Sequence, residues 1–133
     1  MAPDFLSLED VIAIHQDQIE NYGGSHGIRD LGLLQSAVAQ PSSGMGGEFF
    51  HSDLVEMAAA YLFHLVKNHP FIDGNKRVGA TAAHVFLRMN GLELTATNEA
   101  FEALVLAVAD GSASKSKATE FLRKHSRARR AEK

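Results

Sequence analysis

Nine consecutive residues, 69–77, hold the side chains best suited to chemistry, in the order His-Pro-Phe-Ile-Asp-Gly-Asn-Lys-Arg. The imidazole of His69 can take a proton from a hydroxyl group near neutral pH, as a general base does. Asp73 supplies carboxylate oxygens, which are the ligands that Mg²⁺ prefers. A general base and a magnesium ligand in one short stretch are suited to activating a hydroxyl group toward a phosphate compound.

The second half of this stretch is suited to holding phosphate. We expect a helix to begin at Asn75, and the first N–H groups of a helix have no partner inside it, while the helix dipole makes that end positive. Gly74 lets a phosphate approach the backbone because it has no Cβ. Lys76 adds a point charge and Arg77 a pair of parallel donors. These features predict a phosphate site at the start of the helix.

Ordinary structural roles explain each of these residues singly. A histidine before proline at a helix end can cap its own helix, and Asp-Gly-Asn is common in turns. Lys76 and Arg77 can simply be solvated, although basic residues at a helix start oppose the dipole. The order of the whole stretch, rather than any one residue, favours a functional site.

The basic residues are unevenly distributed along the chain. Eight of the 13 Lys and Arg residues lie from Lys115 onward, so the first 114 residues carry five bases and 14 acids. Four of these five bases lie in or near the nine-residue stretch: Lys67, Lys76, Arg77 and Arg88. An acidic body with its few cations in one place favours a small anionic ligand over nucleic acid. We expect the basic end from Arg123 onward to be a solvated helix end.

Length and composition indicate one cytoplasmic domain. A chain of 133 residues can bury a single core, and the lack of cysteine excludes disulfides and thiolate metal sites. The histidines lack the spacing of a transition-metal site. Neither an apolar leader nor an apolar run of the ~20 residues that span a membrane is present. We therefore expect no membrane partner.

Apolar spacing and capping residues predict six helices in a compact, all-α, single-domain bundle. The expected helices span 8–22, 30–40, 53–67, 75–90 and 98–110, with a sixth that starts at Ser114. Ser52 and Asn98 are the expected caps of the third and fifth helices. The fourth, apolar along one stripe, is expected to be central. The domain covers 1–126, and 127–133 is predicted to be a flexible basic tail.

A loop rich in glycine and serine, 41–50, separates the second and third expected helices. Glycine makes such a loop flexible, and it ends in the apolar pair Phe49 and Phe50. We therefore predict that this loop is a candidate lid.

The nine-residue stretch resembles the signature of Fic/Doc proteins, His-Pro-Phe-x-[Asp/Glu]-Gly-Asn-[Gly/Lys]-Arg, and meets every position of it. Four further segments are similar to the death-on-curing (Doc) branch of that family: 7–15, 22–24, 27–30 and 86–91. The resemblance implies a Fic/Doc-like fold. It also implies that His69 is the general base, that Asp73 binds Mg²⁺, and that Phe71 anchors the core. The phosphate cradle that it implies is Gly74, Asn75 and Arg77.

Lys76 stands where the AMP-transferring members of the family have a second glycine. For the Doc branch the resemblance implies an inverted nucleotide pose that presents the γ-phosphate. It implies a kinase toxin of a type II toxin–antitoxin system, which uses ATP and Mg²⁺ to phosphorylate a threonine of elongation factor Tu and so blocks translation. A Phd-like antitoxin is the expected partner, because neither Thr95–Glu99 nor Ser52–Glu56 completes the inhibitory pattern [Ser/Thr]-x-x-x-Glu-[Gly/Asn] that many Fic enzymes carry.

Two other functions stay open. One is AMP transfer to a protein hydroxyl group, which Lys76 disfavours. The other is a non-catalytic helical binding module, which the intact His69 and Asp73 disfavour. Three further residues could touch the nucleotide or could simply be solvated: Lys67, Thr81 and Arg88.

Overall fold

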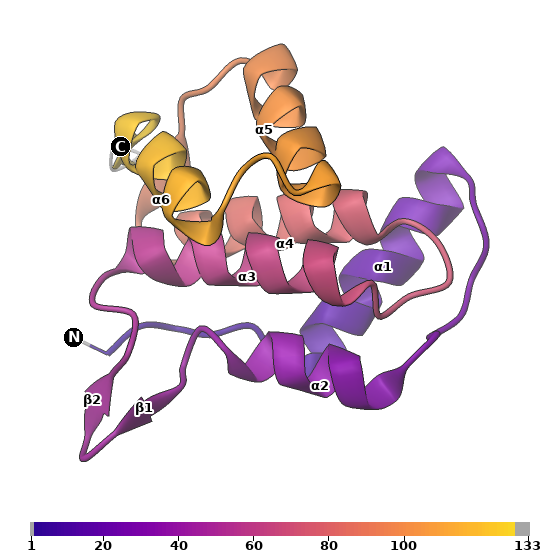
Figure 1. Cartoon of the computed structure of the whole chain (residues 1–133), viewed down its shortest axis with the longest axis horizontal. Helices are drawn as coiled ribbons and strands as arrows, with labels where there is room; N and C mark the ends of the chain where they lie inside the picture. The colour runs from indigo at the N-terminus through magenta and orange to yellow at the C-terminus, as the bar shows by residue number, and fades with distance from the viewer. Residues whose placement is uncertain (1, 130–133) are drawn as a thin grey trace, which may run out of the picture.

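The computed structural model describes residues 2–129 and contains six helices (Figure 1). These are α1 (Leu8–Tyr22), α2 (Leu31–Ala39), α3 (Leu54–Asn68), α4 (Asn75–Met89), α5 (Asn98–Asp110) and α6 (Lys115–Lys124). Two short antiparallel ladders pair β1 (Gly44–Met45) with β2 (Glu48–Phe49), and β3 (Leu92–Leu94) with β4 (Ser126–Ala128). The predicted all-α bundle is confirmed. No helix within 2–129 is both long and apolar enough to cross a membrane.

Five of the six helices begin after a residue whose side chain accepts a backbone N–H from the first turn. These N-caps are Ser7, Asp30, Asp53, Thr97 and Ser114. Two of them correct the predicted caps Ser52 and Asn98 by one residue, because adjacent polar residues cap about equally well and the geometry of the turn selects between them. The exception is α4, which follows Gly74 and has no side-chain cap.

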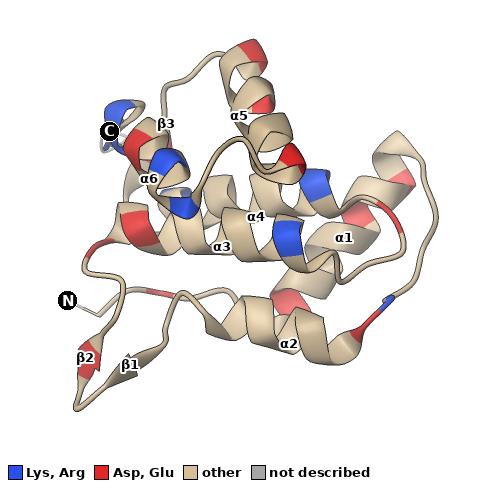
Figure 2. Cartoon of the chain, viewed as in Figure 1, with Lys and Arg blue, Asp and Glu red and all other residues tan. Residues whose placement is uncertain are grey.

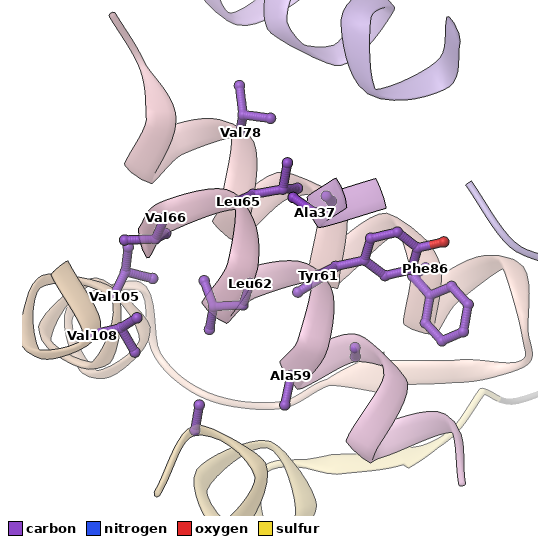
Figure 3. Close-up of a cluster of buried hydrophobic side chains, with 14 of the residues drawn as sticks. Ala37, Ala59, Tyr61, Leu62, Leu65, Val66, Val78, Phe86, Val105 and Val108 are labelled. Carbon is purple, nitrogen blue, oxygen red and sulfur yellow. The ribbon is translucent and has the colours of Figure 1, made fainter. Parts of the chain in front are cut away.

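The central helix is α3, whereas the sequence pattern favoured α4. Residues 57–62 of α3 are all buried, and the helix packs against α2, α4, α5 and α6. Figure 3 shows Leu62 and Leu65 of α3 among Val78 of α4 and Val105 of α5. The apolar stripe of α4 faces this core only in part, since Met89 is exposed at its end. The apolar run 57–62 gives α3 buried side chains on every side over nearly two turns, so neighbouring helices can cover it there from several directions.

Residues 126–128 pair with β3, which corrects part of the predicted flexible tail at 127–133. In the β3–β4 ladder Leu92 lies opposite Ala128, and Arg127 Nε donates to Glu93 Oε1 at 2.5 Å. The N–H of Arg129 also donates to the carbonyl of Gly91. Residues 130–133 lie outside the described residues. Truncation after residue 126 would therefore remove an ordered strand.

Residues 41–50 form a hairpin that does not cover the nine-residue stretch. Gly44 of β1 pairs with Phe49 of β2, and Phe49 packs edge-on against Phe5 with ring centroids 5.5 Å apart. The hairpin precedes α3, whereas the stretch follows it, at the opposite end of the helix (Figure 1). A helix of 15 residues is about 22 Å long. The predicted lid is therefore wrong in this structure.

Candidate active site

The nine-residue stretch forms the α3–α4 loop and the first turn of α4. It lines a cleft of about 330 Å³, at the lower end of the range for small-molecule sites. The lining residues are Val66, His69, Ile72, Asp73, Gly74, Asn75, Lys76, Arg77 and Ala109. The structure thus brings the predicted base, metal ligand and phosphate-binding residues to one place.

The start of α4 at this cleft is suited to binding an anion. Gly74 has φ 80°, and a Cβ there would lie 3.3 Å from Cδ1 of Ile19, so conformation and packing both favour glycine. The first N–H groups of α4 have no cap in the described part of the chain, and the first turn has no acidic residue. Figure 2 shows basic residues at this end of α4 and at the adjoining end of α3. The helix dipole, the free N–H groups and the basic side chains all favour the binding of an anion here.

His69 is the C-cap residue of α3, in the left-handed conformation with φ 51° and ψ 52°. The prediction that this histidine can cap its own helix is therefore confirmed for its backbone. Its side chain is exposed, lines the cleft and has no hydrogen-bond partner within 2–129. A ring that is free at the rim of an anion site can accept a proton from a bound hydroxyl group.

Two backbone N–H groups hold the carboxylate of Asp73. Ser25 donates to Oδ2 at 3.0 Å and Gly74 donates to Oδ1 at 2.8 Å, and these bonds keep the pKa of Asp73 below its usual value. The ionised carboxylate is exposed and keeps lone pairs for a cation. One carboxylate of this kind fits Mg²⁺, which takes its other ligands from phosphates and water. Within 2–129 no three His, Asp or Glu side chains could hold a metal together.

The side chain of Asn75 is buried and binds the loop rather than the cleft. Its Oδ1 accepts the N–H of Phe71 at 2.9 Å, and its Nδ2 donates to the carbonyl of Phe71 at 3.0 Å. Phe71 is itself buried, as expected for a core anchor. In this geometry Asn75 offers a ligand its backbone N–H, whereas its amide group is already engaged.

Arg77 is also engaged in structure. Its Nη2 donates to the carbonyl of Gly23 at 2.9 Å, and Nη1 lies 3.4 Å from the carbonyl of Gln18. A cation at the last carbonyls of α1 is favourable because that end of a helix is negative. Arg77 therefore joins α1 to the cleft, while Lys76 is exposed beside it.

The three further candidates do not line the cleft. Lys67 is exposed, and its Nζ lies near Gly111 at the end of α5. Thr81 is half-buried one turn beyond Arg77. Arg88 lies about 16 Å beyond Arg77 along α4. Their predicted contact with a nucleotide stays a prediction.

Sequence reasoning missed three residues that hold the α3–α4 loop: His15, Ser25 and Arg29. The buried His15 donates from Nε2 to the carbonyl of Asp73 at 2.9 Å, and its ring stacks on Phe71 with centroids 3.9 Å apart. Arg29 donates to the carbonyls of Asn68 and His69. No local spacing links residues this far apart in the chain. The only signal was the similarity of 7–15 and 27–30 to the Doc branch.

Comparisons with known proteins agree with the motif. The family model described as the Fic/DOC family matches residues 5–87. A protein of Mycolicibacterium smegmatis named Toxin Doc is 40% identical over 93 residues, which are 70% of this chain and 69% of that protein. A protein of Escherichia phage P1 named Protein kinase doc is 33% identical over 119 residues, which are 90% of this chain and 93% of that protein. The chain therefore belongs to the Fic/Doc family.

Proposed function

We propose that the chain is a toxin-type protein kinase, which transfers the γ-phosphate of ATP to a hydroxyl group of another protein. The observation that carries the proposal is the free ring of His69 in the same cleft as the uncapped start of α4. The phage relative supports it, since it is named a protein kinase and is similar over nearly the whole of both chains.

Each cleft residue has a role in the proposed reaction. The transferred phosphate would meet the N–H groups at the start of α4 and the charge of Lys76. His69 would take the proton of the acceptor hydroxyl group as its oxygen bonds to phosphorus and the bond from phosphorus to the leaving ADP breaks. Asp73 would hold Mg²⁺, which when bound supplies positive charge that offsets the negative charge of the phosphates. Lys76 in place of glycine favours the γ-phosphate over AMP.

The proposed partner is a Phd-like antitoxin that covers the cleft. An apolar groove between α4 and α5 adjoins it through Lys76 and Arg77 and includes Phe101, Val105 and Leu106. Leu106 is exposed, so a partner helix with apolar residues could bury it. A relative named as a toxin supports a toxin–antitoxin pair. The proposed setting is the cytoplasm.

Labelled ATP tests the reaction. We propose a threonine of elongation factor Tu as the acceptor. Elongation factor Tu is therefore incubated with the chain, Mg²⁺ and ATP labelled at either the γ- or the α-phosphate. Only the γ-label should reach the acceptor, and His69→Ala should abolish transfer without lowering the midpoint of unfolding. Transfer of the α-label would replace the kinase with an AMP transferase. Transfer of neither label, to this protein or to the proteins of a cell extract, would favour a binding module.

The variant Lys76→Gly tests the role of the lysine separately. It removes the side chain that distinguishes this cleft from those of AMP-transferring relatives. Phosphate transfer should fall, and weak AMP transfer should appear. Unchanged phosphate transfer would show that another part of the cleft selects the γ-phosphate.

A further inference from the structure

The backbone of His69 is in a conformation that the residue would not choose alone. Within 2–129 it is the only residue other than glycine with a positive φ. Left-handed geometry is uncommon for residues with a Cβ, and a following proline pushes the preceding residue toward extended geometry. His69 precedes Pro70. Contacts from the rest of the chain must therefore hold it.

Arg29, in the α1–α2 loop, makes such contacts. Its Nε donates to the carbonyl of His69 at 2.6 Å, and its Nη2 donates to the carbonyl of Asn68 at 3.0 Å. These carbonyls lie at the end of α3, where carbonyls lack helical partners and where the dipole favours a cation. The Arg29 backbone is fixed as well, because its N–H donates to the carbonyl of Pro70 at 2.7 Å. One residue thus binds three successive residues around the proposed base.

We propose that Arg29 is a positioning residue, which fixes the left-handed backbone of His69 so that the ring faces the bound phosphate. The inference rests on the proposed function of His69 as a base. A guanidinium group suits this task because its donors form a planar fork that reaches two carbonyls at once, whereas a lysine supplies a single flexible charge. Arg29 does not line the cleft and takes no part in the proposed nucleotide contacts at the start of α4, so its loss should affect turnover rather than nucleotide affinity.

Kinetics of the variant Arg29→Met test this separation. Methionine keeps most of the apolar length of the side chain and removes both donors. We expect kcat to fall about ten- to a hundredfold, as for a misplaced catalytic group, with an unchanged KM for ATP. The matched control is Arg123→Met, which removes an exposed arginine bound to Asp53 at 2.8 Å, at the opposite end of α3 from His69, and should keep wild-type kcat. Millimolar guanidinium should restore part of the kcat of Arg29→Met. It should leave the kcat of the control Arg123→Met unchanged.

A second measurement does not depend on activity. The intraresidue NOE between the amide and α protons of His69 is strong when φ is positive. It should weaken in Arg29→Met and in Arg29→Lys, but not in Arg123→Met. A wild-type chain that transfers no phosphate would overturn the proposed function, while this NOE would still decide the role of Arg29. Wild-type kcat in Arg29→Met, or an unchanged NOE, would overturn the role of Arg29.

Discussion

The variant Asn75→Ala should destabilise the fold, although the signature of the family suggests a ligand-binding residue. The Asn75 side chain makes both its hydrogen bonds to the backbone of Phe71, at 2.9 Å and 3.0 Å. Asn75 is 5% exposed and Phe71 is 1% exposed. Alanine would therefore leave one buried N–H group and one buried carbonyl of Phe71 without a partner.

The size of the loss follows from those two groups. Each buried polar group that loses its partner costs about 1–3 kcal/mol. Water that enters the space left by the amide would lower this cost, so we expect a total of about 2–4 kcal/mol. A single domain has a stability of about 5–15 kcal/mol. The variant would thus remain folded at room temperature but would lose a large part of its free energy of unfolding.

The assay is urea unfolding followed by circular dichroism, with Asn98→Ala as the matched control. Asn98 is the first residue of α5, as Asn75 is of α4, but it is exposed. The change in helix propensity is therefore the same, and the control should stay within about 0.5 kcal/mol of wild type. A difference below about 1 kcal/mol between the two variants would refute the reasoning. It would mean that the Asn75 amide is free to bind a ligand.

Two further variants test the packing of the core and its dependence on pH. Gly79→Ala should cost about 1–3 kcal/mol in urea unfolding, because a Cβ would lie 2.7 Å from Cγ2 of the buried Val66, whereas Gly32→Ala, with 3.4 Å to its nearest neighbour, should cost nothing. Equal urea midpoints for the two glycine variants would show that α3 and α4 can move apart enough to accommodate the methyl group. Burial, with the nearby charge of Lys115, lowers the pKa of His64 to about 4. A histidine whose pKa is lower in the folded state contributes stability above pH 6.5 that is lost as the pH falls toward 4, so His64→Gln should flatten this loss. Identical pH profiles of unfolding would contradict it.

Most helix bounds could be predicted because their signals are local. Ser7 with Asp10 marks the start of α1 and Gly23 its end, and Ser114 marks the start of α6. The β3–β4 ladder could not be predicted, because each strand has three residues and the two are far apart in the sequence. Short basic segments such as 126–129 match a solvated tail equally well. Backbone pairing with β3, rather than any local pattern, makes the strand.

The candidate site was predictable in its membership but not in its internal bonds. Residue types and order placed His69 and Asp73 together just before a helix start, and in the structure both line the cleft at the start of α4. Whether a polar side chain faces a ligand or the backbone depends on contacts made by distant segments. The contacts from His15 and Arg29 are of that kind. The signature therefore contains residues for binding and residues for folding, and the sequence alone placed Asn75 and Arg77 among the binding residues although their side chains bind backbone groups.

The geometry divides the signature into two sets of residues. In the first set the side chains pack in the core, bind the loop or bind the end of α1; these residues are Phe71, Asn75 and Arg77. In the second set the side chains line the cleft; these residues are His69, Asp73 and Lys76. The first set makes the second possible, because the left-handed His69 and the uncapped α4 require a loop that is held from several sides. Substitutions in the first set should therefore lower stability and turnover together. Substitutions of His69 and Lys76 should lower turnover alone, since exposed side chains at a cleft contribute little to folding. Asp73 belongs to both sets, because its carboxylate also accepts the N–H groups of Ser25 and Gly74.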